Sequence, residues 1–95
     1  MAKYELLTIF SASLTDEQKE AICKKYSDLI EKEGGVVTGL NKWGVKKLAY
    51  PIKYKPEGYY VLYNFESGAN VPAKINAVMN IDENVMRSLC LKQEN

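Results

Sequence analysis

The chain has 95 residues, of which 46% are hydrophobic and 26% charged, as in a single soluble globular domain rather than a disordered chain. The net charge is only +1, whereas a domain that binds nucleic acid on its own is usually strongly basic. The charge is unevenly placed, however. Five lysines and no acidic residue lie between Gly34 and Pro56, so this segment carries +5 and the remainder carries −4. The pattern fits a positive strip, although a solvated strand face is the simpler interpretation.

No segment approaches the roughly 18 consecutive apolar residues of a transmembrane helix. The N-terminus also lacks the charged start, apolar run and cleavage site of an export leader. We therefore expect a mature cytoplasmic protein with no membrane partner. Cys23 and Cys90 are far apart and form no CxxC pair, so we expect reduced structural thiols rather than a disulfide.

The first predicted strand covers residues 3–11, where apolar side chains occupy both faces of an alternating pattern. A strand that is apolar on both faces is expected near the middle of a sheet. A helix is predicted over residues 15–33. Thr15 and Gln18 have the spacing of a capping box, and Gly34 follows the last apolar position.

Residues 36–53 form the longest strand-like segment of the sequence. Gly39 and Gly44 predict bends or bulges within it. Pro51 indicates an edge strand, or the end of strand pairing, because proline has no N–H to donate. A turn is then predicted at residues 56–58, where proline and glycine lie close together.

The aromatic-rich residues 59–66 predict a third strand, paired with the second in an antiparallel hairpin. Pro72 can open a second helix, residues 80–84 interrupt it, and residues 85–92 predict a last strand. With right-handed crossovers, this β-α-β-β-α-β order gives a ferredoxin-like split βαβ fold, an α+β sandwich. A four-stranded antiparallel sheet then carries both helices on one face. We expect one domain over residues 1–95.

The predicted fold leaves the other face of the sheet without helices. When the strands are phased by their most apolar positions, the side chains turned toward the helices are Tyr4, Leu6, Thr8, Phe10, Val61, Tyr63, Phe65, Val85, Ser88 and Cys90. The last strand changes phase between Val85 and Ser88, which predicts a bulge there. The uncovered face receives Leu7, Ile9, Tyr60, Leu62, Leu89 and Leu91. Because large exposed apolar patches usually mark binding surfaces, we expect another protein to cover this face.

The sequence offers little that could carry catalysis. There is no histidine, the commonest general base and metal ligand. Two distant cysteines do not make a zinc site, and no glycine-rich nucleotide-binding motif occurs. An acylphosphatase-type site on this fold would require an arginine in residues 11–14, which contain none. We therefore expect no enzyme activity, no cofactor, no metal site and no small-molecule substrate.

RNA-recognition motifs share this topology and stack bases on aromatic side chains of the third strand. In the comparable run, residues 57–64, Glu57 replaces a leading basic residue and Val61 replaces a stacking aromatic. The uncovered face is then mostly aliphatic, which suits protein packing better than base stacking. A single-strand RNA reader that acts alone is thus one alternative. A small ferredoxin-like interaction or regulatory domain is another.

The chain carries GVKKLAYPI at residues 44–52 and KPEGYY at residues 55–60, together with Tyr4-Glu5 near the start and NVMR at residues 84–87. In these blocks, in this order and at this spacing, it resembles the family of ribosomal protein S6, the sixth protein of the bacterial small ribosomal subunit. The resemblance extends from about residue 3 to residue 92. The N-terminus departs from the family by being less basic.

The resemblance implies a split βαβ fold and a structural, RNA-binding role in the small ribosomal subunit. It also implies a heterodimer with ribosomal protein S18, the eighteenth protein of that subunit. The pair would bind the central domain of small-subunit ribosomal RNA. A basic partner of this kind would explain how a nearly neutral chain can lie on RNA, and what covers the apolar sheet face.

Lys46 and Lys47 match paired basic positions of the family, and we expect them to contact phosphates, which position a protein without reading sequence. Strand alternation sends them to opposite faces unless Gly44 bulges the strand. The candidate RNA-contact residues are Lys3, Lys42, Lys46, Lys47, Tyr50, Arg87 and Lys92. For each lysine alone, plain solvation is the simpler interpretation. Tyr50 is as well explained by a structural role or by packing on the partner.

Trp43 is a candidate anchor for the partner protein, because tryptophan is enriched among interface hot spots. Together with the apolar residues of the uncovered face, the candidate partner interface is Leu7, Ile9, Trp43, Tyr60, Leu62, Leu89 and Leu91. Pro51 and Gly58 are interpreted as residues that serve the fold.

Overall fold

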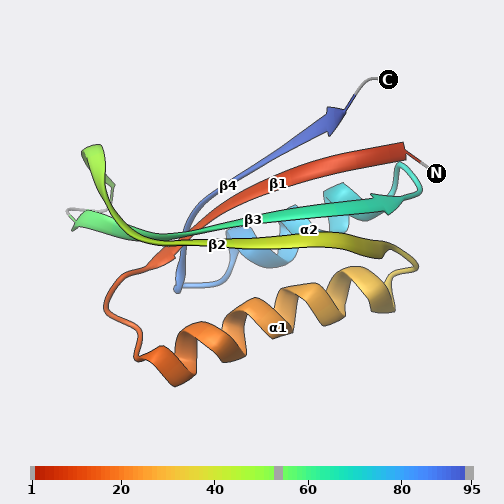
Figure 1. Cartoon of the computed structure of the whole chain (residues 1–95). Helices are drawn as coiled ribbons and strands as arrows, with labels where there is room; N and C mark the ends of the chain where they lie inside the picture. Colours follow the sequence, from red (N-terminus) through yellow and green to blue (C-terminus); the bar gives the residue numbers. More distant parts are fainter. Residues whose placement is uncertain (1, 53–54, 94–95) are drawn as a thin grey trace.

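The computed structural model describes residues 2–52 and 55–93, and within them the order of elements is β-α-β-β-α-β, as predicted. The elements are β1 (Ala2–Ser11), α1 (Asp16–Lys32), β2 (Val36–Ile52), β3 (Lys55–Ser67), α2 (Val71–Asn80) and β4 (Val85–Gln93). Figure 1 shows both helices on the same side of the sheet. The predicted ferredoxin-like α+β fold is confirmed.

The four strands form one antiparallel sheet in the order β2-β3-β1-β4. Strand β1 is paired on both sides, which confirms its predicted central place. Strand β2 lies at an edge, as Pro51 indicated. Both helices cover the same sheet face, and the opposite face carries none (Figure 1). We call this second face the open face.

The main core lies between the sheet and the helices. Its largest fully buried side chains are Tyr26, Tyr63, Phe10, Phe65, Leu6 and Ile30. Every residue predicted to face the helices on β1 and β3 is buried. Full burial of each large apolar side chain contributes about 1.5–3 kcal/mol, so this layer supplies most of the stabilisation. Cys23 is a buried free thiol in this core and Cys90 a half-buried one, and burial raises the pKa of both.

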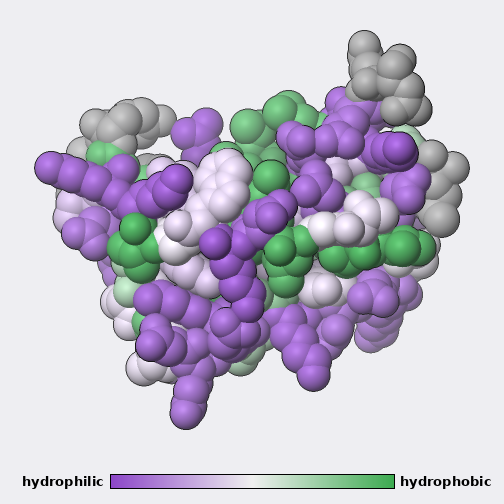
Figure 2. Space-filling view, viewed as in Figure 1, coloured by the Kyte–Doolittle hydropathy of each residue, from purple (hydrophilic) through white to green (hydrophobic). Residues whose placement is uncertain are grey.

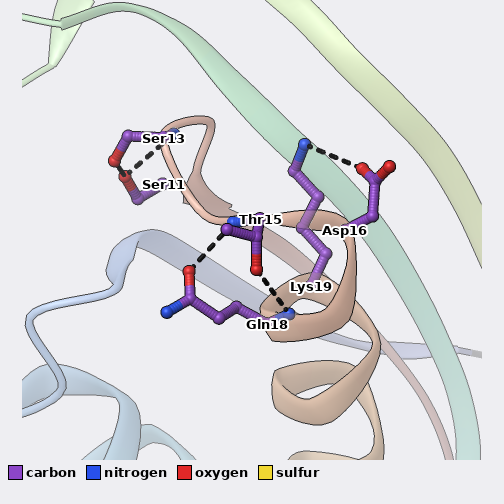
Figure 3. Close-up of polar contacts among 6 residues, drawn as sticks. All are labelled: Ser11, Ser13, Thr15, Asp16, Gln18 and Lys19. Atoms are coloured by element: carbon purple, nitrogen blue, oxygen red, sulfur yellow. Dashed lines mark hydrogen bonds and ion pairs between the residues drawn. The ribbon is translucent and has the colours of Figure 1, made fainter.

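The predicted capping box at the start of α1 is present (Figure 3). The Gln18 backbone N–H donates to Thr15 Oγ1 at 3.1 Å, and the Thr15 N–H donates to Gln18 Oε1 at 2.9 Å. These two bonds satisfy backbone donors that the first helical turn would otherwise leave without partners. In the preceding loop, the hydroxyls of Ser11 and Ser13 lie 2.7 Å apart, so they bond to each other.

The predicted bulges also occur. In β4, Phe10 pairs with Val85 and Ile9 pairs with Arg87, so Met86 is the extra residue between Val85 and Ser88. In β2, the register against β3 shifts between Val37 and Gly39 and again between Lys42 and Gly44. Each extra residue reverses the inside-outside alternation of the residues that follow it.

The turn predicted at residues 56–58 is wrong, because β3 already begins at Lys55. Gly58 lies within the strand, where it pairs with Ser11 on one side and Lys46 on the other. A Cβ atom at position 58 would clash with the side chain of Ile9. The glycine therefore reflects the close approach of a neighbouring side chain rather than a turn.

The connection between α2 and β4 is tied to α1 through Asp82. One carboxylate oxygen of Asp82 accepts hydrogen bonds from Tyr26 Oη at 2.5 Å and Lys25 Nζ at 3.2 Å. The other accepts the Asn84 backbone N–H at 2.9 Å. Burial raises the pKa of Asp82, but these hydrogen bonds outweigh it, and the net shift is below the ordinary value of 3.8.

We expect Asp82→Asn to lower the free energy of unfolding at pH 7 by about 1–2 kcal/mol, because a charged acceptor is replaced by a neutral one. A carboxylate with a lowered folded-state pKa contributes stability above its unfolded pKa and loses it as the pH falls through the folded value. The variant and the wild type should therefore converge in urea unfolding as the pH falls below the ordinary carboxyl pKa and through the lowered folded-state value. Asp28→Asn on the exposed side of α1 is the control. A deficit of Asp82→Asn that does not change with pH would contradict the account.

Candidate binding surface

Leucine side chains line up across the middle of the open face. Leu7 pairs with Leu62 of β3 on one side and with Leu89 of β4 on the other, so one register row places all three side by side. Leu89 is 45% exposed and Leu91 is 54% exposed. Figure 2 shows hydrophobic side chains, in green, near the middle of its upper edge, with hydrophilic ones to either side.

A hollow of about 290 Å³ opens on this face and is lined by Leu7, Ile9, Tyr60, Arg87 and Leu89. Four of these residues are predicted partner contacts, and Arg87 is a predicted RNA contact. The structure therefore brings together residues from three strands that were grouped from strand alternation alone. Its mainly apolar walls make the hollow suitable for an apolar side chain of another protein.

The expectation that the open face has no cover from the chain itself is wrong at Ile9. Ile9 is only 7% exposed and belongs to a second buried cluster with Leu48 and Met86, against which Tyr60 packs. The far end of β2 curls away from the helices, toward the open face (Figure 1). This curl brings Leu48 over Ile9, and the β4 bulge turns Met86 to the same side. Ile9 is thus first a core residue.

Two aromatic rings and a lysine form a stack beside the hollow. The Trp43 ring lies on the Tyr60 ring, with centroids 6.4 Å apart and planes 15° from parallel. The Nζ atom of Lys46 lies 5.1 Å from the centroid of the Trp43 ring. Trp43 is 45% exposed despite these contacts. The stack therefore joins the border of the hollow to the lysine-bearing end of β2.

Lys46 and Lys47 point to opposite faces, as alternation predicted. The bulge at Gly44 occurs but does not change this, so the exception that we expected for it is wrong, because the bulge precedes both residues. Lys46 pairs with Gly58, and its contact with Trp43 places its side chain on the open-face side. Lys47 pairs with Glu57 and is therefore directed to the helical side of the hairpin. Both lysines are exposed. The two basic positions are therefore not equivalent in space.

Apart from Arg87 in the hollow, the other predicted RNA-contact residues that the structure describes lie away from Lys46 and Lys47. Lys42 points to the helical side, where its Nζ forms an ion pair with Glu20 at 2.6 Å that raises the Lys42 pKa. Lys3 pairs with Gln93, so Lys3 lies at the end of β1 opposite to the hairpin. Lys92, one position before Gln93, lies at that same end. The side chain of Tyr50 lies outside the described residues.

Leu48 and Met86 were missed as contributors to this surface. Strict alternation along the strand does not predict on which face either residue lies, because Met86 is the bulge residue and Leu48 follows a register shift. Gly58 could have indicated close packing of Ile9 and Leu48 at this point, because a glycine within a strand often marks the close approach of another group.

The described part of the chain contains no group of three or more His, Cys, Asp or Glu side chains placed to hold a metal ion. No helix in residues 2–52 and 55–93 is long and apolar enough to cross a membrane. An apolar hollow and a partly exposed leucine row, with cationic side chains beside them, are typical of a protein that binds other macromolecules.

Comparison with known proteins agrees with this class. Residues 3–92 match the family described as "Ribosomal protein S6". The "Small ribosomal subunit protein bS6" of Clostridium novyi is 43% identical over 94 residues, which cover 99% of both chains. The protein of the same name from Caldanaerobacter subterraneus is 37% identical, with the same coverage. The chain therefore belongs to the ribosomal protein S6 family, whose members are structural ribosomal proteins and not enzymes.

A solved structure supports the fold separately. The crystal structure of 30S ribosomal protein S6 from Thermotoga maritima superposes with a TM-score of 0.93. The match covers 97% of this chain and 87% of that chain, at 20% sequence identity. The arrangement of the sheet and the two helices is thus retained where most side chains differ.

The division of the open face into core and exposed residues can be tested on the isolated chain. Ile9→Ala should lower the free energy of unfolding by about 2–4 kcal/mol, because it removes buried methyl groups from a packed cluster. Leu89→Ala, at a half-exposed position, should lower it by less than about 1 kcal/mol. Urea unfolding of both variants measures the difference. Equal losses would show that Ile9 is as exposed as Leu89 in solution.

Proposed function

We propose that this chain binds the central domain of small-subunit ribosomal RNA as a heterodimer with ribosomal protein S18, and that the partner covers the open face. It would then be a structural constituent of the small ribosomal subunit in the bacterial cytoplasm. The observation that carries the proposal is the apolar hollow of Leu7, Ile9, Tyr60 and Leu89 with Arg87 in its wall, beside a stack that ends in Lys46.

Hydrophobic burial supports the protein part of the proposal. Leu89 and Leu91 are about half exposed and lie on the same face as the hollow. A partner that buried them would gain roughly 25 cal/mol for each Å² of apolar surface removed from water. A convex apolar side chain that entered the hollow would provide the kind of anchor that dominates protein interfaces.

Charge supports the RNA part of the proposal. The whole chain has a net charge of only +1, which is a weak attraction for a polyanion. Three described lysines near the end of the β2–β3 hairpin, Lys46, Lys47 and Lys55, are nevertheless exposed and lie close together. A basic partner bound on the open face would extend this positive region. The chain and its partner would then bind RNA more strongly than either protein alone.

The structure supports a solitary single-strand RNA reader less well than a protein-binding face, although the Trp43 ring is exposed beside the hollow. Val61, at the position of a stacking aromatic, is fully buried toward the helices. The middle of the open face is occupied by the leucine row, which offers no ring for a base to stack on.

The open face can be tested with Leu89→Asp. A carboxylate placed in a buried apolar interface should weaken binding to S18 by at least about 30-fold, because moving it from water into apolar surroundings is costly. Folding should be little affected, because the side chain is half exposed in the free chain. Binding is measured by isothermal titration calorimetry and folding by urea unfolding.

Ile81→Asp is the matched control, since Ile81 is 84% exposed at the end of α2, away from the open face. Its affinity for S18 should equal that of the wild type. If Leu89→Asp binds S18 normally, or if both variants lose binding equally, the partner does not lie on the open face.

The lysine pair can be tested on the complex. Replacing Lys46 and Lys47 together with alanine should weaken binding of the heterodimer to a central-domain RNA transcript. The slope of log affinity against log salt should fall by about one to two units, since fewer counterions are released. The control replaces Lys24 and Lys32, both exposed on α1, and should leave the slope unchanged. An unchanged slope in the Lys46, Lys47 variant would remove the hairpin from the RNA interface.

A further inference from the structure

The bulge in β2 decides on which face Trp43 and Lys46 lie. Residues three positions apart in a regular strand point to opposite faces. Here Lys42 pairs with Val61 and Gly44 pairs with Tyr60, so Trp43 is an extra residue opposite the partner strand. Gly44 has a φ of +87°, in the left-handed region that favours glycine. The bulge therefore brings Trp43 and Lys46 to the same face.

The neighbours of these two residues hold the arrangement in place. Tyr60 is half-buried and packs against the cluster that contains Ile9 and Leu48, so it is a fixed support for the Trp43 ring. The residue paired with Lys46 is Gly58, which presents no side chain that could compete for the lysine. Among the described residues, the Trp43 ring is thus the neighbour that attracts the Lys46 ammonium.

We propose that Trp43 is a positioning residue for RNA binding, which holds the Lys46 ammonium at the border of the hollow for contact with an RNA phosphate. The inference rests on the proposed function and deepens it, because the phosphate lies where the bound partner and the RNA meet. It also changes the role expected for Trp43, from an anchor for the partner protein to a support for a cation.

The physical basis is preorganisation. A free lysine side chain samples many rotamers, and ordering it on binding reduces affinity. A lysine already held over an aromatic ring has lost part of that freedom before RNA arrives. Lys47 has no such support among its described contacts and points to the helical side of the hairpin. Lys46 therefore supplies the phosphate contact, and Lys47 serves as a matched internal comparison.

The test measures RNA affinity of the complete heterodimer with S18 on a central-domain transcript over a range of salt concentrations. Lys46→Ala should lower the salt slope by about one unit, and Lys47→Ala should leave it unchanged. Trp43→Leu should weaken RNA binding by about 3- to 10-fold while the charge of Lys46 is retained. Trp43→Phe, which keeps a ring, should restore most of the affinity. In the Lys46→Ala background, Trp43→Leu should have no further effect.

Fluorescence provides a second readout. Trp43 is the only tryptophan of the chain, so its emission reports on the stack directly. Lys46→Ala should change the emission of the free chain, whereas Lys47→Ala should not. RNA binding by the heterodimer should alter the Trp43 emission of the wild type more than that of Lys46→Ala. Urea unfolding checks that each variant is folded.

Three results overturn this inference while leaving the proposed function intact. The first is an equal change of the salt slope in Lys46→Ala and Lys47→Ala. The second is that Trp43→Leu and Lys46→Ala reduce RNA affinity additively when combined. The third is that Trp43→Leu loses as much affinity for S18 as for RNA. The last result would make Trp43 a protein anchor. If the wild-type heterodimer does not form, or does not bind the transcript, the proposed function fails and this inference fails with it.

Discussion

The structure depends on the pairing of β1 with a strand on each of its sides. Because β1 is held in register by β3 and by β4, its side chains alternate strictly between two environments. Leu6 lies in the core under the helices, whereas the next residue, Leu7, lies in the row across the open face. A slip of one residue would exchange these environments, so this pairing fixes both the core and the binding surface.

Local departures from regular pairing give the open face its particular shape. The β4 bulge turns Met86 toward Ile9, and the β2 bulge at Gly44 turns Trp43 toward Tyr60. Regular strands would have left an open face without this relief, lined by the side chains of every second residue. The irregular strands instead produce a small second core, a hollow next to it and a ring stack that leads to a lysine.

Much of the fold could be predicted from sequence because its signals are local. The capping box of α1, the edge position of β2 and the phase change in β4 each arise within a few residues of the chain. Gly58 was misread as part of a turn because its reason for being glycine, the side chain of Ile9, lies in another strand. The exposed leucines followed from alternation alone. The burial of Ile9 did not, because it depends on a curl of β2 that no local pattern records.

The cover that Leu48 provides over Ile9 also restricts how another molecule can approach. Leu48 fills the space over Ile9, whereas Leu89 and Leu91 on β4 stay about half exposed. The exposed leucines of the open face therefore lie on its β4 side, so the face is asymmetric for any protein that docks on it.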